Sequence, residues 1–511
     1  MERIVSLFLV LALSCCVLTG CGGDFSVTCH IGDYPLSLDP QMASTQVEII
    51  ITGNAFEGLM RFDENGKPIP AASESYTVSD DGLVYTFTLR KDLKWSNGET
   101  LSAEDFIFGL ERATLSSTKA PFGYLLKAIV GAEERLSGKN TPLSVKNEGG
   151  KIVITLKEKS DAFLSALCHP VASPCKEDFF EKSGGKYGIG AKNIISNGLY
   201  KIAYTLSNSL VRISKNANYH NALTADCSSV EFKFNDIKKD ENFTDKLIKN
   251  SWDIAVSDND SAQKAVNSGM KVINRYTSAY FLLFNQRATV CKNQDLRNAY
   301  ILSMGEIKTN KFTPLKKLLP NDVTVNGTAA GNLEGLLNYN YSYSPDTARS
   351  LFLKYSSSIT NVNGVGVLCE ENEDVLNVLR PIVSSWQKNL GAYFNIFTVS
   401  KNQIDNKLQD TSFAIMLAEI DSGDSSSFSF VKNIYSALGS PTNLKSAYEK
   451  CLKATTVESS TVALNAFLDA LYNGSYAVPV MTVPKTIVHN KDLENIIVNS
   501  YGGIDFSFVK K

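Results

Sequence analysis

The sequence has few of the side chains that usually carry enzyme chemistry. Only 4 of its 511 residues are histidines. These four, His30, His169, His220 and His489, lie far apart and without the spacing of metal ligands. The sequence also has no Gly-x-Ser-x-Gly nucleophile turn, no Gly-x-x-x-x-Gly-Lys-Ser/Thr phosphate loop and no His-Glu-x-x-His zinc motif. We therefore expect a protein that is not an enzyme and that holds no cofactor or metal.

The chain also lacks an excess of either charge. Its 51 Lys and Arg residues nearly balance its 53 Asp and Glu residues, which gives a net charge of −2. Nucleic-acid-binding proteins usually carry a basic excess, so we expect no nucleic-acid partner. Beyond the amino terminus, no segment approaches the ~20 apolar residues that a membrane span needs. A chain of 511 residues exceeds what one hydrophobic core usually serves, so we expect two or three domains.

One apolar run does occur, at the amino terminus. Arg3 precedes residues 4–18, which are too few for a stable membrane span and fit a secretory signal peptide over residues 1–20. The run ends in Leu18-Thr19-Gly20-Cys21, which resembles the lipobox of bacterial lipoproteins. We expect Cys21 to carry a lipid that anchors the protein to a membrane of the cell envelope, facing the periplasm or the exterior. The alternative is an ordinary signal peptide in which Cys21 happens to lie near the cleavage point.

Cysteine pairing is not specified by the sequence. Beyond Cys21 there are seven cysteines, and none of them shows a Cys-x-x-Cys spacing. Seven is an odd number, so at least one thiol stays unpaired or pairs with another chain. Isolated disulfides are compatible with an oxidising compartment.

Hydrophobic periodicity predicts a mixed α/β protein. Residues 365–369 and 393–399 have the pattern of strands, and the helix between them starts near residue 375 and stops at Gly391. Pro381 should kink or break this helix. We expect residues 365–399 to form a β-α-β unit on a parallel sheet.

The stretch KWSNGETLSAEDF at 94–106 has the local signals of a turn and a helix start. Residues 83–89 alternate like a half-buried strand, and Asn97-Gly98 suits a tight turn. Ser102 and Asp105 have the spacing of a capping box. Three further segments are expected elsewhere: an exposed-edge or half-buried strand at 151–157, a helix near 462–472, and a Ser-rich exposed loop at 421–429.

Several stretches in one order carry a family resemblance. They begin with YPLSLDPQ at 34–41, AFEGLMRFDENGKPIPAASESY at 55–76 and YTFTLRKDLKWSNGETLSAEDFIFGLERA at 85–113. Further stretches follow at 169–179, 196–222, 280–304, 385–391 and 477–484. Together they resemble the bacterial family 5 extracellular solute-binding proteins, the peptide- and nickel-binding components of ABC importers.

The resemblance implies a fold and a set of domain boundaries. The fold is α/β, of the type II periplasmic-binding-protein kind, with two lobes joined by a hinge and an extra domain. Lobe I would comprise residues 21–51, 170–274 and 485–511, the extra domain II residues 52–169, and lobe III residues 275–484. The partners implied are an oligopeptide ligand and the permease subunits of an ABC importer, and we expect a monomer.

The resemblance also implies ligand-binding positions. The amine of a bound peptide needs an acidic partner in the cleft, because burying an unpaired ammonium is costly. Asp421 matches the amine-binding position of the family, with Asp424 as a rival, and Glu419 and Ile420 match the strand that pairs with the peptide backbone. Other matches, which can also be explained as packing or capping, are Ser44, Gln46, Phe122 and Asn285.

Three functions remain open from the sequence. The first is a lipid-anchored receptor that delivers oligopeptides to an importer. The second is the same fold with another solute, such as a cell-wall peptide, a dipeptide or a chelated metal. The third is an envelope scaffold or adhesin with a degenerate cleft, because the tryptophan, tyrosine and proline that the family carries around the Asp421 position are missing here.

Overall fold

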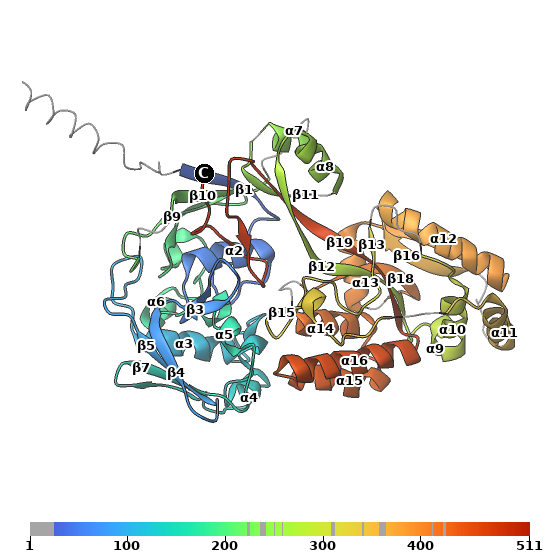
Figure 1. The fold of residues 1–511 in the computed structure, drawn as a ribbon, viewed down its shortest axis with the longest axis horizontal. Coiled ribbons are helices and arrows are strands. Elements are labelled where there is room, and N and C mark those ends of the chain that lie inside the picture. The colour runs from blue at the N-terminus through green and yellow to red at the C-terminus, as the bar shows by residue number, and fades with distance from the viewer. Residues whose placement is uncertain are drawn as a thin grey trace, which may run out of the picture.

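One large mixed sheet runs through the whole molecule (Figure 1). The computed structural model describes residues 25–221, 225–235, 242–249, 251–257, 259–307, 312–339, 342–356, 364–410, 412–422 and 426–511. The main path of the sheet, from the carboxyl-terminal lobe to the amino-terminal lobe, is β17 (Phe394–Val399), β16 (Val365–Glu370), β18 (Ile415–Asp421), β12 (Lys271–Phe284), β19 (Ala477–His489), β11 (Ile254–Ser257), β1 (Phe25–His30), β10 (Cys227–Lys233), β9 (Leu210–Lys215) and β8 (Tyr200–Leu206).

The amino-terminal lobe is built on the β1 end of the sheet. Strand β1 lies between β10 and β11 and is parallel to both. Helix α2 (Gln46–Ala55) packs in the same core, whose buried residues come from 27–254 and from 487–509. The amino-terminal strand β1 and the segment 487–509 therefore share one core.

A second, smaller sheet has the order β4 (Ser73–Val78), β5 (Val84–Leu89), β7 (Lys151–Thr155) and β6 (Val145–Glu148).

Helix α3 (Ala103–Thr114) begins where the local sequence signals place it. Ser102 is the N-cap, and Ser102 and Asp105 form a capping box. The Asp105 carboxylate also accepts a hydrogen bond from the indole N–H of the buried Trp95, at 3.2 Å. Gly98 has a φ angle of +91°, as the tight turn between Trp95 and Ser102 requires. This stretch is a rigid part of the wall of the lobe.

The carboxyl-terminal lobe contains the β-α-β unit. Strands β16 and β17 are parallel, and helix α12 (Glu373–Leu390) connects them. Gly391 follows the helix with a φ angle of +71°, the left-handed conformation expected of a helix stop. The core of this lobe is formed by buried residues between 279 and 481, with Trp386 fully buried among them.

The remaining helices of the carboxyl-terminal lobe cover the sheet (Figure 1). They are α9 (Thr289–Lys292), α10 (Gln294–Ser303), α11 (Pro345–Ser356), α13 (Lys401–Asp410), α14 (Ser427–Ala437), α15 (Thr442–Lys453) and α16 (Val457–Asn473).

Two long antiparallel strands, β12 and β19, connect the lobes (Figure 1). The carboxyl-terminal part of β19 pairs with β11 in one lobe, and the carboxyl-terminal part of β12 pairs with β18 in the other. The β12–β19 ladder is irregular between Arg275 and Ser278, opposite Pro484. Proline has no N–H to donate to a ladder, so a bulge at this position follows from the sequence. We refer to this part of the ladder, residues 275–278 and 483–485, as the hinge.

The local expectations are confirmed for the strand at 83–89, the β-α-β unit and the helix near 462–472, which is α16. Two others are wrong in one of their alternatives, the edge position of 151–157 and the break at Pro381, and the loop at 421–429 is wrong. Strand β7 is not at an edge, because it lies between β5 and β6. Helix α12 continues without a break through Pro381. The Ser-rich segment is not a simple loop, because Asp421 ends β18 and Ser427 begins α14.

The structure also bears on disulfide bonds and on membrane-spanning helices. None of the seven described cysteines forms a disulfide bond. In the described ranges, no helix is long and apolar enough to cross a membrane. Two large cores lie on either side of the hinge, but the predicted domain boundaries themselves remain a prediction.

Candidate functional site

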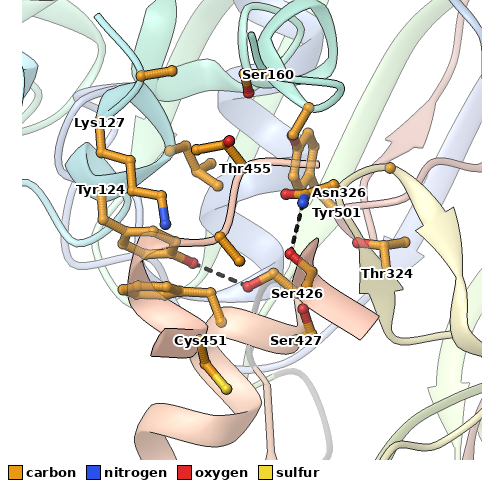
Figure 2. Close-up of a pocket in the computed structure, with 17 residues that line it drawn as sticks. Tyr124, Lys127, Ser160, Thr324, Asn326, Ser426, Ser427, Cys451, Thr455 and Tyr501 are labelled. Atoms are coloured by element: carbon orange, nitrogen blue, oxygen red, sulfur yellow. Dashed lines mark hydrogen bonds between the residues drawn. The ribbon is translucent and has the colours of Figure 1, made fainter. Parts of the chain in front are cut away.

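A cavity of about 80 Å³ lies where the two lobes meet. Tyr124 and Lys127 line it from the amino-terminal side, and Ser426 and Ser427 from the start of α14 (Figure 2). Tyr501, close to the carboxyl terminus, also lines it. These parts of the chain come together only in the tertiary structure.

Tyr124 is the main contact between the lobes at this cavity. Its ring stacks on that of Phe428, with centroids 4.0 Å apart and an interplanar angle of 17°. Its hydroxyl lies 2.6 Å from the Ser429 hydroxyl oxygen. It also lies 3.2 Å from the Ser426 hydroxyl oxygen (Figure 2). These contacts hold the amino-terminal side against the first turn of α14, so the lobes are closed onto each other here.

Polar contacts reinforce the closed arrangement. The Lys127 amine donates to the backbone oxygen of Leu452, and it lies 5.3 Å from the Phe428 ring centroid. Burial lowers the pKa of Lys127 from its ordinary value to about 8, and the nearby Lys157 acts in the same direction. Nearby, the Asp161 carboxylate accepts a hydrogen bond of 3.0 Å from the N–H of Val457, the first residue of α16.

Strand β18 pairs with one neighbouring strand over its full length and with the other over only part of it. It pairs with β16 only through residues 415–417, whereas it pairs with β12 over its full length, 415–421. Residues 418–421 therefore have a strand partner on one side only, as far as the described chain extends. An extended peptide can add to such an edge through main-chain hydrogen bonds. Ile420 and Glu419 belong to this segment, as the resemblance implied.

The two carboxylates at the end of β18 each have a lysine partner. The Asp421 carboxylate lies 2.5 Å from the Lys485 amine, and these side chains are 38% and 31% exposed. Glu419 forms an ion pair with Lys401 and accepts a hydrogen bond from the Ser278 hydroxyl. Burial alone would lower the pKa of Lys401, but the Glu419 carboxylate outweighs it and raises that pKa.

Gln46 belongs to a second, smaller cavity of about 20 Å³ beside the hinge. Lys485 and Gly502 also line this cavity. The Gln46 side chain donates to the backbone oxygen of Gly502, at 3.3 Å. Gly502 and Tyr501 are neighbours in the chain, so one turn near the carboxyl terminus borders both cavities. The structure thus brings Gln46 and Asp421 to the same region through Lys485.

The other sequence-predicted residues have structural partners. The Ser44 hydroxyl donates to the Glu48 carboxylate at 3.0 Å, at the start of α2. Phe122 is buried against the His169 ring. The Asn285 amide donates to the backbone oxygen of Phe413 at 2.6 Å and holds the end of β12. Asp424 lies outside the described residues, as does Cys21. Their roles in ligand binding stay predictions.

Sequence reasoning missed most of the cavity lining. Tyr124 and Tyr501, which line the larger cavity, and Lys485, which lines the smaller one, have no motif of their own. Each becomes relevant only through contacts with distant segments. A weak signal was available for Lys485, since it follows directly on Pro484 in the last stretch of the resemblance. In the ranges that the structure describes, no three His, Cys, Asp or Glu side chains come together as metal ligands do.

Two lobes that share a pair of long strands and enclose a cavity define a hinged binding protein. The family follows from comparison with known proteins. Residues 67–441 match the model of the bacterial extracellular solute-binding proteins, family 5, and the chain belongs to this family.

A relative of similar length supports this assignment, and two solved structures share the fold. A dipeptide-binding protein of Lactococcus lactis subsp. cremoris is 27% identical over 546 residues, which cover 98% of this chain and 97% of the relative. The Haemophilus influenzae OppA complex with the peptide RPPGFSPFR has a TM-score of 0.74 at 19% identity, covering 95% of this chain and 99% of that one. The Escherichia coli murein tripeptide binding protein MppA also gives 0.74, at 20% identity, covering 95% and 98%. The α/β fold predicted from the sequence, of the type II periplasmic-binding-protein kind, is confirmed.

Proposed function

We propose that this protein captures oligopeptides between its lobes and delivers them to the permease of an ABC importer, while a lipid on Cys21 holds it at the membrane. The observation that carries the proposal is the one-sided strand pairing of residues 418–421, in a molecule whose two lobes enclose a cavity. A strand edge binds peptide backbones with little dependence on side chains. The names of its relatives, dipeptide-binding and oligopeptide-binding proteins, support the same ligand class.

Peptide binding requires the lobes to separate first. The cavity of about 80 Å³ is well below the ~300 Å³ at which ligand pockets usually begin. The Tyr124 contacts to Phe428 and Ser429 must therefore break for a peptide to enter. Rotation at the hinge, where the β12–β19 ladder is already irregular, would open the site without disrupting either core.

Native mass spectrometry of the purified protein tests the proposal. We expect co-purified peptides a few residues long, and a rise in melting temperature when a peptide library is added, because a ligand that binds only the folded state stabilises it. The same spectra report the oligomeric state, for which we expect a monomer. Protein that carries no peptide and shows no thermal shift would contradict the proposal. A non-peptide adduct of defined mass would instead indicate another solute.

A pair of variants on α14 localises the site. Ser427 lines the cavity, whereas Ser436 is exposed on the same helix. Ser427→Arg fills the cavity with a long charged side chain and should abolish peptide binding. Ser436→Arg introduces the same residue away from the cavity and should bind like the wild type. Equal binding by both variants would place the ligand elsewhere.

The lipid anchor has a separate test. Cys21→Ser removes the thiol that the lipobox resemblance assigns to the lipid. We expect the variant to move from the membrane fraction to the soluble or secreted fraction. An unchanged membrane fraction would rule out the anchor without affecting the peptide-binding proposal.

A further inference from the structure

The end of β18 presents two carboxylates that are already neutralised from within the protein. Lys485 lies 2.5 Å from the Asp421 carboxylate, and Lys401 pairs with Glu419. Each of these two carboxylates thus has a lysine partner. A third carboxylate, that of Asp405, is also near: burial raises its pKa, Lys401 opposes this, and Glu419 and Asp421 act in the same direction as burial. A peptide amine that binds at this end of β18 would therefore contact carboxylates that already form ion pairs with lysines.

The position of Lys485 is fixed by the hinge. It lies on β19 opposite Arg275, directly after Pro484 and the bulge of the ladder. Its side chain runs beside the small cavity that Gln46 and Gly502 line, and its amine reaches Asp421 on the neighbouring lobe's strand. Lys485 therefore connects the hinge directly to the position where the family resemblance places the amine of a bound peptide.

We propose that Lys485 determines the specificity of this site for the amino terminus of the ligand, because its amine occupies the place at Asp421 that a peptide ammonium would take. The inference rests on the proposed peptide-binding function. In this protein a free amino terminus gains little over a blocked one. To reach Asp421, the free ammonium of a peptide must displace the Lys485 amine. The ion pair that it then forms with the Asp421 carboxylate only replaces the ion pair that was lost.

The charges explain why the ammonium cannot simply add to the pair. Two cations held at one carboxylate repel each other, so the second gains less than the first. Glu419 does not supply a replacement acceptor, because its carboxylate already bonds to Lys401 and to the Ser278 hydroxyl. Asp421 and Lys485 are partly exposed, so exchange of one amine for another does not require burying an unpaired charge.

The test compares peptides with free and acetylated amino termini by isothermal titration calorimetry. The probes are RPPGFSPFR and penta-alanine, each in both forms. For the wild type we expect the two forms of a probe to bind within about threefold of each other. In Lys485→Met the Asp421 carboxylate loses its ion pair with Lys485, and we expect the free form to bind at least about tenfold more tightly than the acetylated form.

Three control variants complete the experiment. Lys485→Arg keeps the positive charge and should behave like the wild type. Adding Asp421→Asn to Lys485→Met should remove the preference that Lys485→Met creates. Lys182→Met removes a lysine from another lysine–aspartate pair, at 3.1 Å from Asp178 on α6 (Glu177–Lys182), and should leave the ratio unchanged.

The results separate this inference from the proposed function. Peptides that bind every variant with an unchanged ratio of free to acetylated affinity would overturn the role of Lys485 and leave peptide binding intact. A wild type that already prefers the free form tenfold would also overturn it. If no variant binds any probe or library peptide, the proposed function fails and this inference fails with it.

Discussion

Asp39 and Asp421 make almost the same contact in two different surroundings. Asp39 lies 2.6 Å from the Arg112 guanidinium, and Asp421 lies 2.5 Å from the Lys485 amine. The Asp39 side chain is only 4% exposed, whereas that of Asp421 is 38% exposed. A buried pair cannot lose one partner cheaply, while a partly exposed pair can exchange its partner for water or a ligand. The first pair stabilises the lobe, and the second can take part in binding.

The surroundings of Asp39 show what a structural pair looks like. Gln41 donates its backbone N–H to Asp39 and accepts a hydrogen bond of 2.7 Å from Arg112. The Arg112 guanidinium also lies over the Phe180 ring, 4.1 Å from its centroid. The SLDPQ stretch, one of the most specific parts of the family resemblance, therefore works here as scaffold.

The largest expected effect follows from breaking the buried pair. Asp39→Asn leaves the Arg112 charge buried without its partner, and we expect a loss of about 3–5 kcal/mol in the free energy of unfolding of the amino-terminal lobe. Urea denaturation measures it. The matched control is Asp178→Asn, which should cost less than about 1 kcal/mol, because the Asp178 side chain and its nearer lysine partner, Lys182, are both mostly exposed. Similar losses in both variants would show that burial does not distinguish the pairs.

An intermediate effect is expected at Glu48, and it should depend on pH. Burial alone would raise the pKa of Glu48, but hydrogen bonds from the Ser44, Thr45 and Ser37 N–H groups outweigh it and lower that pKa. A carboxylate whose pKa is lower in the folded than in the unfolded state stabilises above its unfolded pKa, and this stability is lost as the pH falls through the folded pKa.

Glu48→Gln tests this dependence. The variant should lose about 2 kcal/mol of stability at neutral pH, since hydrogen bonds to a charged group are removed. The difference between the wild type and the variant should begin to shrink as the pH falls below the ordinary glutamate pKa of about 4.3, and it should be lost as the pH falls through the lower pKa of the folded state. Melting temperatures over a pH series measure this, and a difference that stays constant down to pH ~2 would contradict the assignment.

A smaller effect is expected at the contact between the lobes. Phe428→Ala removes the ring that stacks on Tyr124, a contact worth about 0.5–1.5 kcal/mol. We expect a shift toward the open form, seen as a larger radius of gyration in solution scattering. Tyr435→Ala removes a similar stack, on Tyr448 at 4.1 Å within one lobe, and should leave the radius unchanged. An equal radius for both variants would show that the Tyr124 stack does not hold the lobes together.

The smallest effect on stability is expected at Asp421. Asp421→Asn breaks a pair that is partly exposed, and we expect a change of less than about 1 kcal/mol in the free energy of unfolding. Urea denaturation of Asp421→Asn, measured in parallel with Asp39→Asn, compares the two losses of stability. A large loss of stability at Asp421 would make this residue part of the scaffold and would weaken its assignment to the ligand site.

Much of the local structure could be predicted because its causes lie within a few residues. The capping box of Ser102 and Asp105, the left-handed Gly391 and the β-α-β unit all depend on neighbours in the chain. The errors arose where tertiary context decides. The 151–157 segment looks like an edge strand until β6 pairs with it, and the Ser-rich segment looks like a loop until Ser426 caps α14.

The candidate site shows the same division. Asp421, Glu419 and Ile420 could be named because the family resemblance assigns their positions. The partner of Asp421 could not be named, because Lys485 is 64 residues away and reaches it only through the pairing of β12 with both β18 and β19. Tyr124 and Ser429, 305 residues apart, meet only where the lobes touch.

The sequence by itself determined the elements, the family and the strand that carries the candidate acids, because short-range patterns and family stretches act over neighbouring residues. Only the tertiary structure decided which charges are buried, which are paired and what encloses the cavity. Burial and pairing depend on segments that are distant in the chain and on the closure of the lobes, and no local pattern of residues contains that information.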